Sequence, residues 1–247
     1  MAITSFMRYE KKFLLSDEQV EAVMPSIYEK MEVDAYCKDG RSYTVYNIYY
    51  DTDHDDVIRE SVERPYYKEK LRIRTYSLND ENAPVFLELK KKINGIVTKR
   101  RIVMTRSEYR SFLETKAVPD NANVQITNEL KYYLSHHDVH PNVFLSYERR
   151  AFFGKNDPEF RLTIDKKILA RRTDLVFEKG NYGEPLLPEG KNLMEVKFSG
   201  NLPLWLVKQF SANKIYHRSF SKYGTEYKMK CYERLNSKGD NNYVRII

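Results

Sequence analysis

The stretch KLRIRTY, residues Lys70 to Tyr76, decides how the rest of the chain is interpreted. Side chains alternate between the two faces of an extended strand. One face of this segment therefore carries Lys70, Arg72, Arg74 and Tyr76. The other face, which can enter a hydrophobic core, carries Leu71, Ile73 and Thr75. The row of cations is either a sheet surface exposed to water or one wall of an anion-binding site.

The same two-sided pattern recurs in further segments. Charged side chains alternate with apolar ones in RYEKKF (8–13), VFLELKKK (85–92), VTKRRIVM (97–104), SYERRAF (146–152), FRLTID (160–165) and MEVKF (194–198). An antiparallel sheet with one solvated side explains any single segment. Across all of them, however, Arg and Lys recur at a spacing of two among single carboxylates, and Arg suits bidentate phosphate binding. If such a sheet closes into a barrel, its charged side chains converge on one polyanion.

Two capping boxes predict where helices begin between these strands. Ser16 with Gln19 starts a helix that we expect over residues 16–33, kinked at Pro25. Thr105 with Glu108 starts a second, short helix. Apolar residues at helical spacing on both helices are predicted to be core contacts.

Further helices follow from apolar spacing and from proline. The spacing from Ile126 to Leu134 indicates a helix, Pro203 suits the first turn of another, and residues 219–235 predict a terminal helix. Residues 38–41, 79–84 and 180–192 are predicted loops. We predict a single domain over residues 1–235, followed by a polar tail at 236–247.

Composition limits the class of protein. The chain has 247 residues, 41% of them hydrophobic, and a net charge of +7, which favours anionic partners. Cys37 and Cys231 lie far apart without CxxC spacing, and no secretory leader is evident, so a cytoplasmic location is expected. No apolar run predicts an integral membrane segment. His136, His137 and His140 have no companion cysteines, so a zinc site is not expected.

In chain order, RYEKKF, VYNIYYDT, LRIRTY, LELKKK with TKRR, SYERRAF, FRLTID, MEVKF and SFSKY resemble the motifs of the VTC domain. This domain is the catalytic module of polyphosphate polymerases within the CYTH-like superfamily of triphosphate tunnel metalloenzymes. The resemblance spans nearly the whole chain. It implies an α+β, mainly β fold, in which an eight-stranded antiparallel closed tunnel barrel has helices packed outside and a C-terminal helix. It also implies that ATP and inorganic polyphosphate bind with Mn²⁺ or Mg²⁺.

The resemblance assigns roles to individual residues. Its catalytic set is Lys12, Arg72, Arg74, Lys90, Arg149, Arg161 and Glu195, with Glu195 also the metal ligand. Its substrate-binding set is Lys99, Arg101, Tyr147, Lys197 and Lys222, with Arg8 and Glu10 as weaker candidates. Glu88 and Asp165 are alternatively carboxylates that neutralise and orient neighbouring arginines.

The implied activity is metal-dependent transfer of the ATP γ-phosphate to a growing polyphosphate chain. Related hydrolases and cyclases begin with a Glu-x-Glu-x-Lys strand, whereas this chain has Arg8, Glu10 and Lys12, which favours the polymerase. Triphosphate hydrolysis, with water as the acceptor, is the first alternative. The phosphate-sensing domain and membrane segment of eukaryotic polymerase subunits are not evident in the sequence.

A non-catalytic binder of polyphosphate or nucleic acid is the second alternative. The chain has 20 tyrosines, and aromatic side chains beside cations suit single-stranded nucleic acid. Tyr43, Tyr46, Tyr49 and Tyr50, however, lie in a segment of high β-propensity and are predicted mainly to pack. Nucleic acid is therefore not the expected partner.

Overall fold

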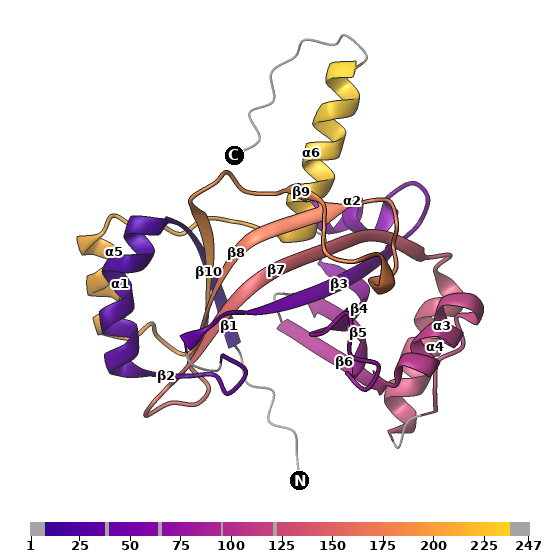
Figure 1. The fold of residues 1–247 in the computed structure, drawn as a ribbon, viewed down its shortest axis with the longest axis horizontal. Helices are drawn as coiled ribbons and strands as arrows, with labels where there is room; N and C mark the ends of the chain where they lie inside the picture. Colours follow the sequence, from indigo (N-terminus) through magenta and orange to yellow (C-terminus); the bar gives the residue numbers. More distant parts are fainter. Residues whose placement is uncertain (1–7, 38–39, 64–65, 95, 121–122, 238–247) are drawn as a thin grey trace. The chain divides into compact units, whose positions relative to one another are not determined.

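The computed structural model describes residues 8–37, 40–63, 66–94, 96–120 and 123–237 (Figure 1). The chain forms two compact units. Unit 1 comprises Met1–Val45, Tyr147–Ile168 and Leu187–Phe220, and unit 2 comprises Tyr46–Ser146, Leu169–Leu186 and Ser221–Ile247. The single-domain organisation expected from the sequence stays a prediction.

Ten strands of the described chain form an antiparallel sheet. Its strands are β1 (Arg8–Ser16), β2 (Met31–Val33), β3 (Tyr43–Asp51), β4 (Tyr67–Thr75), β5 (Val85–Ile93), β6 (Ile96–Met104), β7 (His140–Gly154), β8 (Arg161–Arg171), β9 (Glu184–Pro185) and β10 (Lys191–Ser199). Hydrogen bonds join eight of them in the order β1-β10-β8-β7-β3-β4-β5-β6, while β2 pairs with β7 and β9 with β8. Within the described residues β1 and β6 end this order, so hydrogen bonds do not close the sheet. The antiparallel, mainly β fold is confirmed, and closure into a barrel stays a prediction.

Six α-helices accompany the sheet in the described part of the chain, which makes the fold α+β. They are α1 (Asp17–Lys30), α2 (Asp56–Val62), α3 (Arg106–Thr115), α4 (Val124–His136), α5 (Leu204–Ala212) and α6 (Lys222–Ser237). Both predicted capping boxes are confirmed. The Ser16 hydroxyl accepts from the Gln19 N–H at 3.3 Å, and the Thr105 hydroxyl accepts from the Glu108 N–H at 3.2 Å. None of the described helices combines the length and the apolar character needed to cross a membrane.

Several predicted boundaries were wrong. The first helix ends at Lys30 rather than at residue 33, because Met31 becomes extended and buried as β2 pairs with β7. The terminal helix begins at Lys222 rather than at residue 219. The predicted loop 180–192 contains β9 and the start of β10. Within the predicted loop at 38–41 and the predicted tail, residues 38–39 and 238–247 lie outside the described residues.

Helix α2 was missed because its N-terminus is satisfied from the preceding strand. The Asp51 carboxylate, at the end of β3, accepts from the N–H groups of Val57 and Ile58 at 2.8 and 2.9 Å. These are donors that an isolated helix leaves without partners, and the capping box signature does not include such a contribution. Asp51 is fully buried, so its position in β3 fixes where α2 begins.

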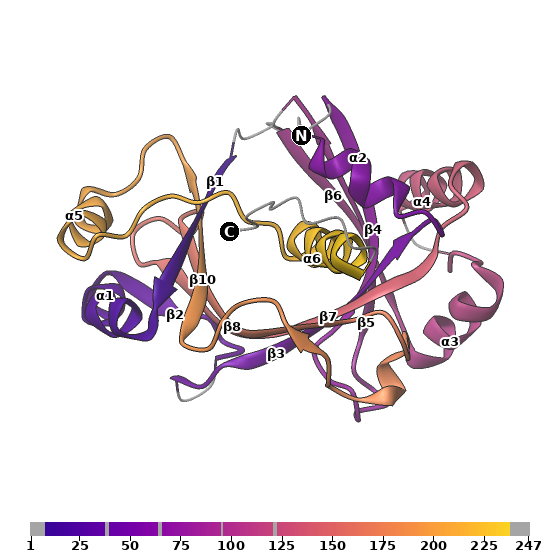
Figure 2. The same ribbon diagram turned by 90° about the horizontal axis from the view of Figure 1, so that it is seen from above.

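In unit 1, helices cover the apolar face of the sheet. Alternate residues of β1 and β10, among them Phe13, Leu15, Met194 and Val196, are buried in one hydrophobic cluster with residues of α1 and α5. The two helices lie side by side in both views (Figures 1 and 2). Because strand side chains alternate, Glu10 and Lys12 of β1 and Glu195 and Lys197 of β10 are on the opposite face.

Unit 2 repeats this arrangement with different elements. Leu71, Leu89 and Ile102 from β4, β5 and β6 are buried in a second cluster. Helix α3 contributes Phe112 and α4 contributes Leu130 to the same cluster, and both helices pack against β6 (Figure 1). The two-sided character of KLRIRTY is thus confirmed, with Leu71 and Ile73 fully buried.

Buried ion pairs fasten α6 to the rest of unit 2. Arg172, just after β8, donates to both carboxylate oxygens of Glu226 at 2.6 and 2.8 Å and to Asp55 at 2.5 Å. Lys230 of α6 also contacts Asp55, at 3.2 Å. At the start of the helix, the Tyr223 hydroxyl donates to Asp51 at 2.6 Å. Helix α6 is therefore held at three successive turns.

Thr105→Ala tests the capping box of α3. The change removes the side-chain acceptor for the Glu108 N–H and should lower the free energy of unfolding by about 1 kcal/mol. Urea denaturation measures the loss. Ser107→Ala, at an exposed position of the same helix, is the matched control and should change stability by less than about 0.5 kcal/mol. Equal losses in the two variants would contradict a stabilising role for the cap.

Candidate functional site

On the charged face of unit 2, three lysines form a row across neighbouring strands. Lys70 of β4 lies opposite Lys90 of β5, and Lys90 lies opposite Lys99 of β6. Like charges directly opposite each other destabilise a sheet. A bound polyanion would offset this cost, so the row favours an anion site.

Glu88 of β5 lies opposite Arg72 of β4 and Arg101 of β6, two residues along each strand from the three lysines. Its side chain is 1% exposed and contacts Arg72 at 2.7 Å, Lys99 at 3.3 Å and Arg74 at 4.0 Å. Arg101 donates to it through Nε at 2.7 Å. Burial alone would raise the pKa of Glu88, but these four cations hold it well below its ordinary value. Glu88 thus neutralises and orients its neighbouring cations.

Strand β3 supplies two polar contacts that the sequence interpretation missed. The amide oxygen of Asn47 accepts from Arg74 Nε at 2.8 Å, and the Tyr49 hydroxyl accepts from Arg72 at 3.0 Å. The expectation that tyrosines of this strand mainly pack holds for Tyr50, which is 2% exposed, but Tyr49 is an exception. Alternation along the strand was the available signal, because it separates Asn47 and Tyr49 from Ile48 and Tyr50.

Helix α6 begins beside this face. Its first residue is Lys222, one of the predicted substrate-binding cations, and its second is Tyr223. The ring of Tyr223 packs against that of Tyr49 with centroids 4.8 Å apart, and Lys70 Nζ lies 5.8 Å from the Tyr223 centroid. The start of α6, β3 and β4 therefore bring predicted and missed residues together in unit 2.

In unit 1 the corresponding pair is Arg149 with Asp165. The guanidinium donates through Nε and Nη2 to the two oxygens of Asp165, at 2.6 and 2.7 Å. Asp165 is fully buried. Burial alone would lower the pKa of Arg149, but Asp165 together with Tyr147 and Glu195 raises it well above its ordinary value. The guanidinium is thus permanently charged and fixed in orientation, 4.9 Å from the Tyr147 ring centroid.

Glu195 lies between two of the predicted catalytic cations. Its carboxylate oxygens are 3.7 Å from Lys12 Nζ and 3.9 Å from Arg149 Nη2. Lys12 also contacts Glu10 at 3.2 Å and donates to the backbone oxygen of Phe220 at 3.0 Å. The strands therefore bring Lys12, Arg149 and Glu195 together.

The oxygen atoms around Glu195 fit a hard divalent cation. Thr163 of β8 lies directly opposite Glu195, and its hydroxyl is buried with no hydrogen-bond partner in the described part of the chain. No cluster of three or more His, Cys, Asp or Glu ligands occurs among the described residues. Mg²⁺ and Mn²⁺ commonly bind through one or two carboxylates and complete their coordination with water and substrate phosphates. Glu195 is the residue here that would hold such an ion.

The remaining predicted residues are Lys197 of β10, Arg161 of β8 and Arg8 of β1. Lys197 of β10 contacts Glu10 at 3.7 Å and pairs in register with Arg161. Arg161 is exposed, with its guanidinium 4.9 Å from the Phe153 ring centroid. Arg8 pairs with Ser199 in the ladder between β1 and β10, and its side chain lies outside the described part of the structure.

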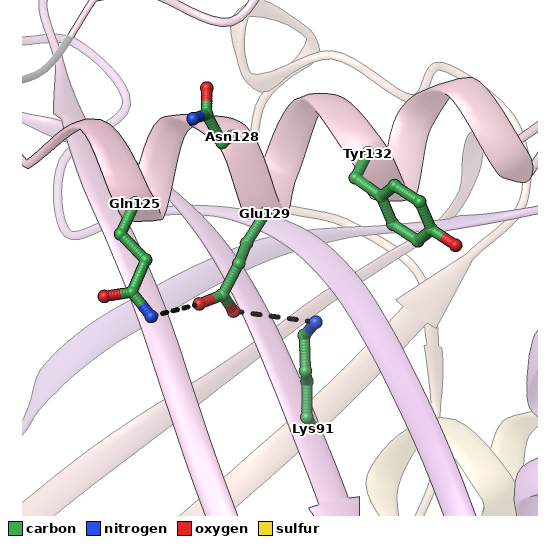
Figure 3. Close-up of a pocket in the computed structure, with 5 residues that line it drawn as sticks. All are labelled: Lys91, Gln125, Asn128, Glu129 and Tyr132. Carbon is green, nitrogen blue, oxygen red and sulfur yellow. Dashed lines mark hydrogen bonds and ion pairs between the residues drawn. The ribbon is translucent and has the colours of Figure 1, made fainter.

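A pocket beside α4 is a separate feature of unit 2 (Figure 3). Its lining is Lys91, Gln125, Asn128, Glu129 and Tyr132. Glu129 accepts from Gln125 at 3.1 Å and contacts Lys91 at 3.6 Å, as the figure shows. None of these residues belongs to the predicted site, so the pocket does not mark it.

Comparisons with known proteins bear on the family and on the fold. The family model of the VTC domain matches residues 7–230. A structure from Bacillus halodurans, titled a "putative adenylate cyclase", is similar with a TM-score of 0.52 and 16% identity over 86% of this chain and 92% of that one. That likeness shows the fold alone. The Schizosaccharomyces pombe Mediator head module also aligns, with a TM-score of 0.41 and 11% identity over 93% of this chain and 95% of that one, and carries no argument.

No curated protein matches the sequence. The match to the family model nevertheless covers most of the chain, and it includes every strand that carries the predicted cations. The chain therefore belongs to the VTC domain family.

Proposed function

We propose that this chain is a polyphosphate polymerase, which transfers the γ-phosphoryl group of ATP to a growing polyphosphate chain with the help of a divalent cation. The observation that carries the proposal is the lysine row of Lys70, Lys90 and Lys99 beside arginines fixed by Glu88. That face supports binding of a linear polyanion. Membership of the VTC family supports polyphosphate as the polyanion.

The reaction makes one bond and breaks one. A terminal oxygen of the acceptor phosphate attacks the γ-phosphorus of ATP in line, and the bond from that phosphorus to the bridging oxygen of the β-phosphate breaks. ADP leaves with the bridging oxygen, and the acceptor chain gains one phosphate. Because the attacking oxygen is already an anion, no protein base is required. Catalysis can then come from positioning and from cations that stabilise charge on the phosphoryl oxygens.

Each unit carries its own set of candidate phosphate-binding residues. In unit 2 the phosphate-binding residues are Arg72, Arg74, Lys90, Lys99, Arg101 and Lys222. In unit 1 they are Lys12, Arg149, Arg161 and Lys197, with Tyr147 and the weaker candidates Arg8 and Glu10. Arginines held by buried carboxylates need little rearrangement when substrate binds, which favours both affinity and rate.

Glu195 would hold Mn²⁺ or Mg²⁺. When bound, the ion neutralises phosphate charge and helps to align the reacting groups. The carboxylate in turn separates Lys12 from Arg149. Cys37 and Cys231 are both free thiols, which supports a cytoplasmic location for this activity.

Incubation of the protein with ATP and Mn²⁺, followed by sizing of the products, tests the proposal. Polymerisation yields ADP and a ladder of polyphosphate chains. Release of inorganic phosphate without longer chains would instead establish triphosphate hydrolysis. Tight binding without turnover would establish a non-catalytic binder and overturn the proposed activity.

Arg72→Ala should weaken binding of tripolyphosphate by roughly 1.5–3 kcal/mol, because a charge-assisted contact is lost. Calorimetry at fixed salt measures the affinity. Arg100→Ala is the matched control, since Arg100 lies on the other face of β6 and pairs with Glu129 at 3.0 Å. Unchanged affinity in a folded Arg72→Ala variant would place Arg72 outside the binding site.

A competition experiment separates polyphosphate from nucleic acid in the same assay. Tripolyphosphate should displace ATP, and its affinity should fall steeply as salt rises, because several cations contact one polyanion. A single-stranded oligonucleotide at matched phosphate concentration should displace ATP poorly. Stronger competition by the oligonucleotide would favour the nucleic-acid alternative.

Glu195→Gln should lower metal-dependent turnover by at least about a hundredfold, since several kcal/mol of transition-state stabilisation are lost with the metal ligand. ATP affinity in EDTA should persist or increase, because a negative charge near the phosphates is removed. Rates across a Mn²⁺ titration and affinities in EDTA are the paired measurements. Glu148→Gln, which removes a carboxylate that pairs with Lys166 and Lys167, is the control. Wild-type turnover in Glu195→Gln would show that Glu195 is not the metal ligand.

Glu88→Gln should lower the free energy of unfolding by about 3 kcal/mol at neutral pH, because a buried charge cluster loses its anion. The folded-state pKa of Glu88 is lowered, so its contribution is present above the ordinary pKa of about 4.3 and is lost as pH falls through the lowered value. The difference from wild type should therefore shrink only in acid below about pH 4. Urea denaturation at several pH values measures this difference in the free energy of unfolding. Glu81→Gln, which removes an exposed ion pair with Arg110, is the control and should change stability little. A difference that stays constant into strong acid would contradict the electrostatic origin.

A further inference from the structure

We propose that Tyr49 contacts the substrate, donating a hydrogen bond from its phenolic hydroxyl to a phosphoryl oxygen of the bound polyphosphate. This inference rests on the proposed function, because the acceptor is the polyanion of that reaction. It adds to the site a neutral donor whose charge changes close to physiological pH. In the sequence, Tyr49 lies in VYNIYYDT and is expected mainly to pack rather than to bind substrate.

The first support is the direction in which the Tyr49 hydroxyl is held. Its oxygen accepts a hydrogen bond from Arg72 at 3.0 Å, and Arg72 is itself fixed by Glu88, with Nε 2.8 Å from the carboxylate. A hydroxyl that accepts one hydrogen bond still has its own proton to donate. Among the described residues, no acceptor receives that proton. The donor is thus oriented by Arg72, one of the predicted phosphate-binding residues.

The neighbouring tyrosine provides an instructive contrast. The Tyr223 ring packs against that of Tyr49 in a tilted arrangement with an interplanar angle of 32°, yet the Tyr223 hydroxyl donates to the buried carboxylate of Asp51 at 2.6 Å. The Tyr223 hydroxyl therefore joins α6 to Asp51, the residue that caps α2, while the Tyr223 ring packs against that of Tyr49. Of the two neighbouring phenols, Tyr49 is the one whose proton remains available to a ligand.

The charges around Tyr49 match a role in anion binding. From β4 it faces Lys70, Arg72 and Arg74; burial alone would raise its pKa, but these three cations lower it to about 8. The carboxylates near Tyr49 on β3 and β5 interact with other residues. Glu88 of β5 pairs with Arg72, while Asp51 of β3 binds Tyr223 of α6, the helix that begins at Lys222.

Ionisation and anion binding are therefore linked. The protonated phenol donates to a phosphoryl oxygen, whereas the phenolate repels it and competes for Arg72. Tripolyphosphate should accordingly raise the pKa of Tyr49, and by reciprocity its affinity should fall as pH rises through about 8. The hydroxyl thus makes binding sensitive to pH in a range where the ordinary Arg and Lys side chains remain charged.

The test compares Tyr49→Phe with Tyr50→Phe, using tripolyphosphate as the probe. Tyr49→Phe should lose about threefold to tenfold in affinity at pH 7 and show a shallower decline between about pH 7 and 9 than the wild type. Tyr50 is adjacent, on the opposite face, and its hydroxyl is buried without a hydrogen-bond partner in the described structure. Tyr50→Phe should match the wild type in both respects. Circular dichroism confirms folding of each variant.

Ultraviolet difference titration gives a second, direct readout. The wild type should contain one tyrosine that ionises near pH 8, absent in Tyr49→Phe, and tripolyphosphate should shift that step upward. Tight binding by the wild type with the same affinity and pH slope in Tyr49→Phe would overturn this inference alone. Failure of the wild type to bind tripolyphosphate would overturn the proposed function and, with it, the contact from Tyr49.

Discussion

A carboxylate that is withdrawn from water needs cations around it, and this requirement shapes both charged faces of the protein. Glu88 in unit 2 and Asp165 in unit 1 are fully buried, a situation that is strongly unfavourable unless the charge is paired and hydrogen-bonded. Their partners Arg72 and Arg149 are consequently fixed in position as well as in charge. Glu88 lies among four cations and holds together side chains that would otherwise repel each other. Asp165 fixes the single guanidinium of Arg149 through two hydrogen bonds.

Much of the fold follows from local sequence signals. Alternation with a period of two places Leu71 and Ile73 in the core and Arg72 on the charged face, whatever the remaining strands do. The capping boxes are equally local, since each joins residues three apart. Features that depend on distant segments were not predictable in this way. Helix α2 takes its cap from Asp51, and β2 forms only because a partner, β7, is present.

In the candidate site, too, some features follow from local sequence and others depend on distant segments. Residue types and strand parity predicted which cations share a face, but they could not supply the register that lines up Lys70, Lys90 and Lys99. They also could not show which oxygen of Glu88 meets which arginine. Tyr49 and Tyr50 are chemically identical neighbours, and composition or β-propensity treats them alike. Only their opposite orientation, together with the position of Arg72, distinguishes a polar contact from a core residue.

The fastening of α6 limits how this protein can be shortened or fused to another. Arg172 is partly buried between Glu226 and Asp55, and Lys230 adds a further contact one turn later. A chain that ended before Glu226 would leave Arg172 with one carboxylate instead of two and would leave Asp55 without Lys230. Tyr223 would then keep its bond to Asp51 on a helical segment too short to remain folded by itself. Affinity tags and fusion partners are therefore best attached beyond Lys230, where the helix no longer contributes to this buried network.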